Sequence, residues 1–366
     1  MSRNSTELDR RTALKLTGGV ATSGLAGLAG CAGGTGGSDD SGGSTDGSGG
    51  TDNSGGSGDT ATDSGGSEEL TSIVHGATNG GTTGILTSVM ADQGFDEDHG
   101  FTLQAEGFAS PPKVQQQLVF NEDIPTGYMG SIVATRMHSK GENPQLIGPY
   151  MLYHAYIVTR SDTDIEGPAD LAGKQISFAS EAADAWLKFV VMLDEAHGVS
   201  RDQYEFVQAA PPAALSLLDK GELDAILTYE PLMTKALLQY DFETVFSPRE
   251  AWREAEDLPL TTVDLAWTKD WYDANPDAGV SLAEAFIDTQ QYLNENIDAV
   301  VEEYSDSIGL ENQEQIDLAT ERLVDIYPSE WDIEAFQESE RLMVQKARDL
   351  GLIEAEPTDD IFNEVL

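Results

Sequence analysis

The order of apolar and polar residues predicts strands and helices that alternate from residue 70 to 230. Alternating or continuous apolar stretches bounded by turn residues predict strands, and apolar residues spaced three or four apart before a glycine predict helices. The predicted strands are 70–77, 101–108, a short one within 121–131, 144–152, 154–160, 174–180, 204–209 and 222–231. The predicted helices are 85–94, 110–120, 181–198 and 211–221.

The chain from about residue 281 onward is mostly helical and amphipathic in pattern, most clearly over 281–304. Strands that alternate with helices at this spacing predict parallel sheets with right-handed crossovers. The pattern restarts after the polar stretch 161–173. We therefore expect an α/β fold of two lobes with a cleft between them, followed by C-terminal helices.

The first 30 residues have the pattern of an export signal. Paired arginines at 10–11 and Lys15 precede a charge-free stretch, 16–30, that is too short and too rich in glycine to span a membrane as a helix. The segment "RRTALKL" resembles the twin-arginine export motif. It departs from that motif at Asp9, where Ser or Thr is usual, and at Ala13, where Phe is usual.

The single cysteine of the chain, Cys31, ends this stretch and cannot form an internal disulfide. The preceding residues, "LAGC", resemble the lipobox of prokaryotic lipoproteins. We expect Cys31 to become the lipidated N-terminus of the mature protein; the alternative is an unmodified thiol. The following Gly/Ser/Thr/Asp-rich stretch, up to residue 69, has almost nothing apolar to bury. It predicts that residues 31–69 form a disordered tether.

The composition is strongly acidic, with 65 Asp and Glu against 20 Lys and Arg and a net charge of −45. A field of this sign repels nucleic acid and anionic lipid, so neither is an expected partner. The acidic residues are spread along the chain rather than gathered in one block. This distribution favours a surface adapted to strong salt, in which screening removes the repulsion between carboxylates, and it suggests a halophilic prokaryote.

Four segments, in order and at the expected spacing, resemble the SsuA/THI5-like (NMT1-like) branch of the periplasmic-type substrate-binding proteins. They are "ADQGFDEDHGFTLQ" (91–104), "IPTGYMGSIVATRMHSKG" (124–141), "IEGPADLAGKQISFAS" (165–180) and "LLDKGELDAILTYEPLMTKAL" (217–237). The third contains the widely shared Asp-Leu-x-Gly-Lys motif, and the fourth ends its strand in aromatic-Glu-Pro. The resemblance covers about 70–300.

This resemblance implies the two-lobed periplasmic binding protein type II fold, with two crossover strands as a hinge. The first lobe would comprise 70–157 plus 265–366 and the second 158–264, with the crossings near 155–160 and 261–268. The lobes would close on a small-molecule ligand as rigid bodies. The implied partners are the permease and ATPase subunits of an ABC transporter. We expect a monomer, held on the extracellular face of the cell membrane by its lipid, without cofactor or metal.

In open α/β sheets, ligands bind beyond the carboxyl ends of the strands. The turn 79–84 could instead be an ordinary helix start with Thr82 or Thr83 as its N-cap, and Ser110 or Ser180 could merely cap a helix. Applied to the predicted strands, the rule gives these candidate ligand contacts: Asn79, Gly80, Thr82, Thr83, Phe108, Ser110, Ser131, Tyr153, His154, Ser180, Glu181, Tyr229 and Glu230.

The candidates include two carboxylates, Glu181 and Glu230, among several aromatic side chains. Carboxylates with aromatic faces suit a planar, amine-bearing or cationic ring. This favours a thiamine-pyrimidine-like heterocycle over a sulfonate, nitrate or taurine-class ligand. An anion would need Arg or Lys, which Lys113 or Arg136 could supply from nearby in sequence.

The sequence lacks the signatures of common enzymes. It has no Gly-x-Ser-x-Gly elbow, no second cysteine, and five histidines without i, i+4 spacing, so no nucleophile or zinc site is expected. The strongest rival is a pyrimidine-synthesis enzyme of the same superfamily. Its cytosolic members carry a cysteine-rich motif, whereas this chain has none and begins with an export signal.

Overall fold

The computed structural model describes residues 70–328 and 330–366. The predicted export signal, the predicted lipidation at Cys31 and the predicted tether all lie outside these residues. Across the described ranges, none of the helices combines the length and apolar character needed to cross a bilayer. The same ranges contain no group of three or more His, Cys, Asp or Glu residues arranged to hold a metal ion.

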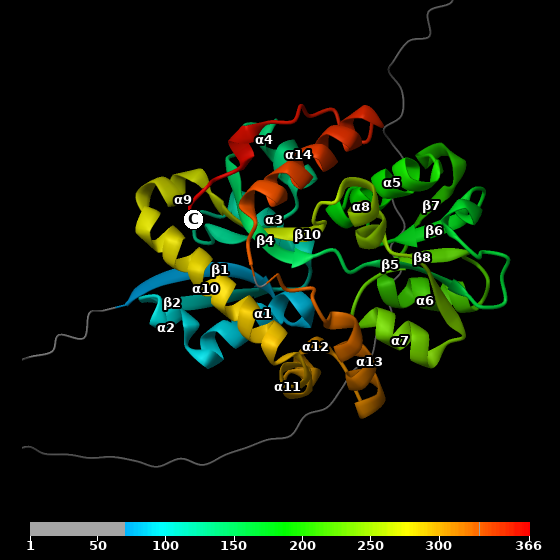
Figure 1. Ribbon diagram of the computed structural model, residues 1–366, viewed down its shortest axis with the longest axis horizontal. Helices are drawn as coiled ribbons and strands as arrows, with labels where there is room; N and C mark the ends of the chain where they lie inside the picture. Colours follow the sequence, from blue (N-terminus) through cyan, green and yellow to red (C-terminus); the bar gives the residue numbers. More distant parts are fainter. Residues whose placement is uncertain (1–69, 329) are drawn as a thin grey trace, which may run out of the picture. The chain divides into compact units, whose positions relative to one another are not determined.

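The described residues form two sheets of five strands each (Figure 1). The first sheet has the order β2-β1-β3-β10-β4 and the second the order β7-β6-β8-β5-β9. The strands of the first sheet are β1 (Thr71–Thr78), β2 (Phe101–Phe108), β3 (Thr126–Met129), β4 (Pro144–Leu152) and β10 (Thr261–Thr268). Those of the second are β5 (Tyr156–Arg160), β6 (Gln175–Phe178), β7 (Glu205–Gln208), β8 (Ala225–Thr228) and β9 (Phe242–Phe246).

The sheets are mixed, so the prediction of parallel sheets is right only in part. β1 runs parallel to β2 and β3, and β6 runs parallel to β7 and β8. In contrast, β10 is antiparallel to β3 and β4, and β5 is antiparallel to β8 and β9. The reason lies in the topology. β5 is the first strand after the chain leaves the first sheet, and β10 is the first strand after it leaves the second. Neither strand is therefore connected to a preceding strand of its own sheet by a crossover helix.

The helices match most of the predicted positions, with shifted ends. The predicted helix over 281–304 is divided at Asn296, and the pair β9–α8 was not predicted. The helices are α1 (Gly81–Gln93), α2 (Phe95–Asp98), α3 (Pro111–Phe120), α4 (Ser131–His138), α5 (Asp184–His197), α6 (Pro211–Asp219), α7 (Leu232–Gln239), α8 (Pro248–Glu256), α9 (Lys269–Ala274), α10 (Pro276–Glu295), α11 (Ile297–Glu303), α12 (Ser305–Ile308), α13 (Gln313–Leu323) and α14 (Ile333–Asp349).

Neighbouring residues of the central strands enter different hydrophobic clusters, which shows that the first sheet is covered on both faces. Tyr128 and Ile147 pack with α1 and α10, whereas the adjacent Met129 and Leu146 pack with α3, α4 and α14. Successive side chains of a strand point to opposite faces. The two sets of helices therefore lie on opposite sides of the sheet, as Figure 1 shows for α10 and α14.

The last long helix, α14, contacts both halves of the fold. Phe336, near its start, packs with residues of the first sheet, while Met343 and Val344 belong to the core around α5 and the second sheet. The helix therefore packs against the elements of both sheets.

The chain passes between its sheets through two short segments, 153–155 and 257–260. The segments predicted as crossings, 155–160 and 261–268, are instead the strands β5 and β10, and each connection lies directly before one of them. The backbone N–H of Tyr153 donates to the carbonyl of Leu260 at 2.7 Å, so the two connections are hydrogen-bonded to each other. A pair of short, linked connections suits a hinge, because few backbone torsions need to change when the units move.

Candidate functional site

The turn between β1 and α1 is fixed by its glycines and by bonds to its carbonyls. Gly81 has a left-handed φ of 71°, which favours glycine, and a Cβ on Gly80 would overlap the carbonyl oxygen of Ser307. The Thr83 carbonyl accepts from the Tyr150 hydroxyl at 3.1 Å, and the Thr82 carbonyl accepts from the Tyr327 hydroxyl at 2.8 Å. The N-cap of α1 is Gly80, and neither threonine hydroxyl caps the helix. The Thr83 hydroxyl is instead hydrogen-bonded to the Thr78 hydroxyl at 2.7 Å, and the Thr82 hydroxyl faces His154.

Ends of strands from both sheets meet next to this turn. Thr82 Oγ1 lies 3.4 Å from His154 Nε2, and the His154 ring packs edge-on against the Tyr229 ring with centroids 5.9 Å apart. The members of this strand-end group, as we call it, are Thr82, Thr83, Tyr128, His154, Phe178 and Tyr229. Thr82 follows β1, His154 lies in the connection between the sheets and Tyr229 follows β8.

Two members of the strand-end group, Tyr128 and Phe178, were missed by the sequence reasoning. The Tyr128 hydroxyl lies 3.5 Å from the Thr83 hydroxyl, and the Phe178 ring lies 6.4 Å from that of Tyr229. They are the penultimate residue of β3 and the last residue of β6. The rule that ligands bind beyond the carboxyl ends of strands was applied mainly to the residues that follow each strand. It would have included Tyr128 and Phe178 if it had been applied to the last residues within every strand as well.

The imidazole of His154 is neutral at ordinary pH. Burial lowers the pKa of His154 to about 4. Its Nδ1 lies 3.2 Å from the carbonyl oxygen of Leu152, which can only accept a hydrogen bond. Nδ1 therefore carries the proton, and Nε2 is the acceptor that faces Thr82.

The two predicted carboxylates already have cationic partners. Arg322 Nε lies 2.5 Å from Glu230 Oε1, and Glu230 Oε2 accepts from the backbone N–H of Thr234 at 3.0 Å. Arg201 Nη2 lies 2.5 Å from Glu181 Oε1. The sequence argument for a cationic ring rested on these carboxylates, and the structure gives the charge of each an internal partner.

Ser131 lies in a buried polar cluster rather than in an open cleft. Its hydroxyl donates to the carboxylate of Glu340, and the backbone N–H of Val133 donates to Asp184 Oδ1 at 3.1 Å. The N-terminus of α4 is thus occupied by two carboxylates of the chain itself. Lys188 Nζ lies 3.2 Å from Asp184 and 3.0 Å from Glu340, and it has no exposed surface.

The ionic states of this cluster follow from burial and pairing. Burial alone would lower the pKa of Lys188, but Glu340 and Asp184 outweigh that effect and raise it above its ordinary value. Burial, together with the nearby Glu340, raises the pKa of Asp264 well above its ordinary range. Neither carboxyl oxygen of Asp264 has a hydrogen-bond partner. The Lys188 ammonium also donates to the carbonyl of Thr261 at 3.0 Å, so it joins α5, α14 and β10, while its two carboxylate partners hold the start of α4.

The remaining candidates lie around the strand-end group with structural contacts of their own. The Tyr153 hydroxyl donates to the Ala185 carbonyl at 2.7 Å, so this buried side chain links the connection to α5. The backbone N–H of Asn79 donates to the Phe108 carbonyl at 2.9 Å. Ser110 immediately precedes α3 without capping it, and Ser180 lies three residues before Ala183, the N-cap of α5.

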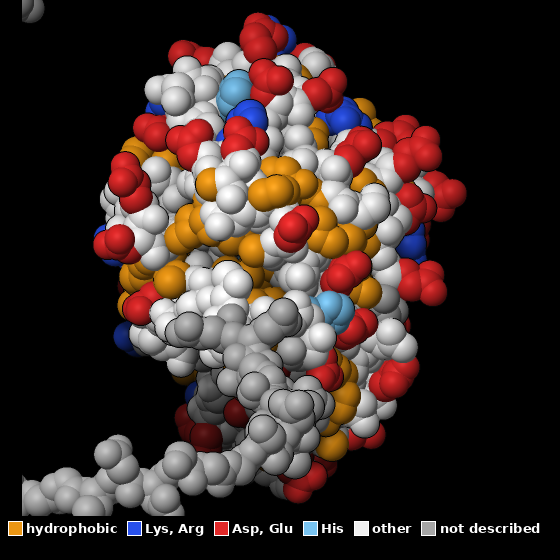
Figure 2. All heavy atoms as spheres, turned by 90° about the vertical axis from the view of Figure 1, so that its left-hand side faces the viewer, with side chains coloured by type: hydrophobic (Ala, Val, Ile, Leu, Met, Phe, Trp, Pro, Cys, Tyr) orange, Lys and Arg blue, Asp and Glu red, His pale blue; other side chains and the backbone are white. Residues whose placement is uncertain are grey.

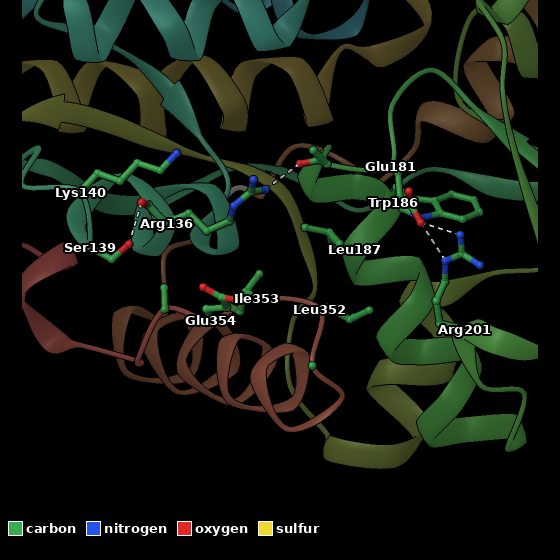
Figure 3. Close-up of a pocket in the computed structure, with 13 residues that line it drawn as sticks. Arg136, Ser139, Lys140, Glu181, Trp186, Leu187, Arg201, Leu352, Ile353 and Glu354 are labelled. Atoms are coloured by element: carbon green, nitrogen blue, oxygen red, sulfur yellow. Dashed lines mark hydrogen bonds and ion pairs between the residues drawn. The ribbon is translucent and has the colours of Figure 1, made fainter. Parts of the chain in front are cut away.

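A cavity of about 660 Å³ lies beside the α4–α5 contact (Figure 3). Figure 3 shows Arg136 and Lys140 on one side, Arg201 on the opposite side, and Leu352 to Glu354 along a third wall. The lining includes Glu181 but no member of the strand-end group. The cavity is therefore a second feature, distinct from the group at the strand ends.

The two mixed sheets, each with one antiparallel strand received from the other half of the fold, define the class of fold: the periplasmic binding protein type II fold. The chain belongs to the NMT1-like family, whose model matches residues 81–303. By sequence, it has no significant match among curated proteins.

Solved structures of similar fold include binding proteins. The alkanesulfonate-binding protein SsuA from Xanthomonas axonopodis pv. citri bound to MOPS is 14% identical, with 81% of this chain and 99% of that chain covered and a TM-score of 0.65. A putative periplasmic sulfonate-binding protein from Methylobacillus flagellatus KT is 18% identical, with 81% and 92% covered and a TM-score of 0.61. The desulfurization enzyme DSZB is also similar, at 15% identity, 79% and 94% coverage and a TM-score of 0.52.

Proposed function

We propose that this protein is an extracytoplasmic solute-binding protein that delivers a small organic solute to an ABC transporter. Membership of the NMT1-like family and the type II fold support this function. In the proposal, the lobes are those predicted, 70–157 with 265–366 and 158–264, with the boundaries moved to the connections 153–155 and 257–260 because β5 and β10 each belong to one sheet. The protein acts as a monomer, and its partners are the permease and ATPase subunits.

The observation that carries the proposal is the meeting of strand ends from both sheets at Thr82, His154 and Tyr229. The side chains there contact one another directly, so a ligand can enter only when the units separate. The linked connections at Tyr153 and Leu260 provide the place for that movement. Capture by opening and closing follows from this arrangement.

The chemistry of the strand-end group supports an uncharged or weakly basic planar ring as ligand. The group offers aromatic faces, a neutral imidazole and hydroxyls, which stack on a ring and hydrogen-bond to its edge. Because Glu181 and Glu230 are paired, they add no free negative charge for a cation. A thiamine-pyrimidine-like heterocycle therefore fits better than a sulfonate, nitrate or taurine-class anion.

The test is calorimetric titration of the full chain with pyrimidines, thiamine, sulfonates, nitrate and taurine in strong salt. We expect a pyrimidine-type compound to bind and Tyr229→Ala to abolish binding, while Tyr240→Ala, a partly buried tyrosine at the end of α7, leaves it intact. Binding of sulfonates alone, abolished by Tyr229→Ala, would reverse the ligand assignment. If no compound binds and mass spectrometry shows one of them converted, the enzyme alternative replaces the proposal.

We further propose that Cys31 carries lipid and that the tether holds the folded part near the outer face of the membrane. The export signal, by the twin-arginine route, and the strongly acidic composition support this location in a halophile. Detergent partitioning of the expressed protein against Cys31→Ala tests it. Equal partitioning of the two proteins into the aqueous phase would contradict the anchor.

A further inference from the structure

We infer that the cavity between α4, α5 and residues 351–355 is a second binding site, and that it takes an organic anion with an apolar body. Its volume of about 660 Å³ lies within the range of roughly 300–1,000 Å³ typical of small-molecule pockets. This site goes beyond the proposed solute site, since it shares no residue with the strand-end group.

The charged residues that line the cavity are more often basic than acidic. Its lining carries three basic residues, Arg136, Lys140 and Arg201, and two acidic ones, Glu181 and Glu354. This small excess of positive charge lies in a chain of net charge −45. Such an excess is unusual for this protein. On the face shown in Figure 2, acidic side chains (red) are spread widely and basic side chains (blue) are few.

Two of these basic residues, Arg136 and Lys140, have no carboxylate partner among the described residues. Among the ion pairs of the described residues, none includes Arg136 or Lys140. Arg136 Nη1 makes one bond, to the Ala182 carbonyl at 3.2 Å, which leaves its other N–H groups available. Lys140 lies in the turn two residues beyond the end of α4, and Figure 3 shows it on the same side of the cavity as Arg136.

The rest of the lining is largely apolar. Trp186, Leu187, Leu352, Ile353 and Ala355 line the cavity. A small inorganic ion would leave this surface uncovered, whereas an organic anion covers it and places its charged group at Arg136 and Lys140.

Such a ligand would contact helices on both sides of the interface between the two units. Arg136 belongs to α4, which covers the first sheet, and Leu187 belongs to α5, which covers the second. The α4–α5 contact is the one that Asp184 makes with the backbone of Val133. The bound anion therefore stabilises the arrangement in which these helices touch.

The experiment is calorimetric titration of the full chain with 2-naphthalenesulfonate, with neutral 2-naphthalenemethanol as the matched compound without charge. We expect the sulfonate to bind at one site and the alcohol to bind much more weakly. Lys140→Gln and Arg136→Gln should each weaken sulfonate binding by roughly tenfold or more, as expected for loss of a charge-assisted contact. Glu354→Gln should strengthen it, because it removes the unpaired negative charge of the lining.

The matched control is Lys220→Gln, which removes an exposed lysine that has no ion pair and does not line the cavity. It should leave sulfonate binding unchanged. Equal binding of the alcohol, absence of binding, or loss of affinity in Lys220→Gln equal to that in Lys140→Gln would overturn the inference. Sulfonate binding that Tyr229→Ala abolishes and Lys140→Gln leaves intact would also overturn it, by assigning the anion to the strand-end group.

Discussion

Asp184 and Val133 are joined across the two halves of this protein: the carboxylate at the start of α5 accepts the backbone N–H in the first turn of α4 at 3.1 Å. The same carboxylate lies 3.2 Å from Lys188, which is fully buried. A single side chain thus satisfies a helix N-terminus of one unit and an ammonium of the other. The opening motion proposed above would have to break or rearrange this contact.

We predict that Asp184→Ala destabilises the protein by about 3 kcal/mol, because it leaves the Lys188 ammonium buried with one carboxylate fewer. Denaturant unfolding at constant salt measures the loss. The matched control is Asp162→Ala, which removes an exposed carboxylate paired with Arg160 and should cost less than about 1 kcal/mol. Equal losses in the two variants would show that the buried pair has no special weight.

Asp264 should make the protein less stable as pH rises. Burial raises the folded-state pKa of Asp264 above its unfolded value, so the folded state retains a proton that the unfolded state releases. Stability from this group is fully present below the unfolded pKa near 4 and is lost as pH rises toward the folded pKa. We predict that Asp264→Asn, which cannot ionise, gains stability relative to the wild type as pH rises.

Unfolding free energies of Asp264→Asn and the wild type at pH 4 and pH 8 measure this difference. The matched control is Asp202→Asn, an exposed residue for which the pH trend should follow the wild type. A constant difference between Asp264→Asn and the wild type at the two pH values would contradict a raised pKa.

His154 should have the opposite dependence in a lower window. Its folded-state pKa is about 4, below the ordinary value of 6.5, so the unfolded state takes up a proton that the folded state refuses. Stability from this group is present above pH 6.5 and falls as pH drops toward 4, by up to about 3 kcal/mol. We predict that His154→Gln unfolds with a weaker pH dependence between these limits.

The comparison for this histidine is His138→Gln, because His138 lies at the surface with a third of its side chain exposed. Its pH profile should follow the wild type between pH 4 and 6.5. If His154→Gln also follows the wild type, His154 is protonated in the folded state and is not the neutral acceptor described above.

A substitution of Glu230 tests whether this predicted ligand contact instead stabilises the fold. Glu230→Gln removes the charge that pairs with the partly buried Arg322, and we predict a loss of about 2 kcal/mol in unfolding free energy with unchanged solute affinity. Glu311→Gln, which breaks the exposed pair with Lys235, should cost less than about 1 kcal/mol. A large loss of affinity in Glu230→Gln at unchanged stability would return Glu230 to the solute site.

The sequence by itself determined the fold class and most of its elements. Strand β2 occupies the predicted range 101–108, and α3 begins at Pro111 as the Pro-Pro start predicts. These elements depend on local alternation, helical spacing and chain-stopping residues, which act over a few positions. The rule that ligands bind at the carboxyl ends of strands selected Thr82, His154 and Tyr229 as candidates, and the structure brings these three side chains together.

Only the tertiary structure decided the pairing of charges and the direction of β5 and β10. Glu230 meets Arg322 across 92 positions, and Ser131 meets Glu340 across 209, so no local pattern could show that these side chains have internal partners. The strand directions depend on which unit the chain has just left. Contacts between distant residues arise from packing of whole elements, and for this reason the sequence could predict the strand ends, whereas only the fold determined which charges near them have internal partners.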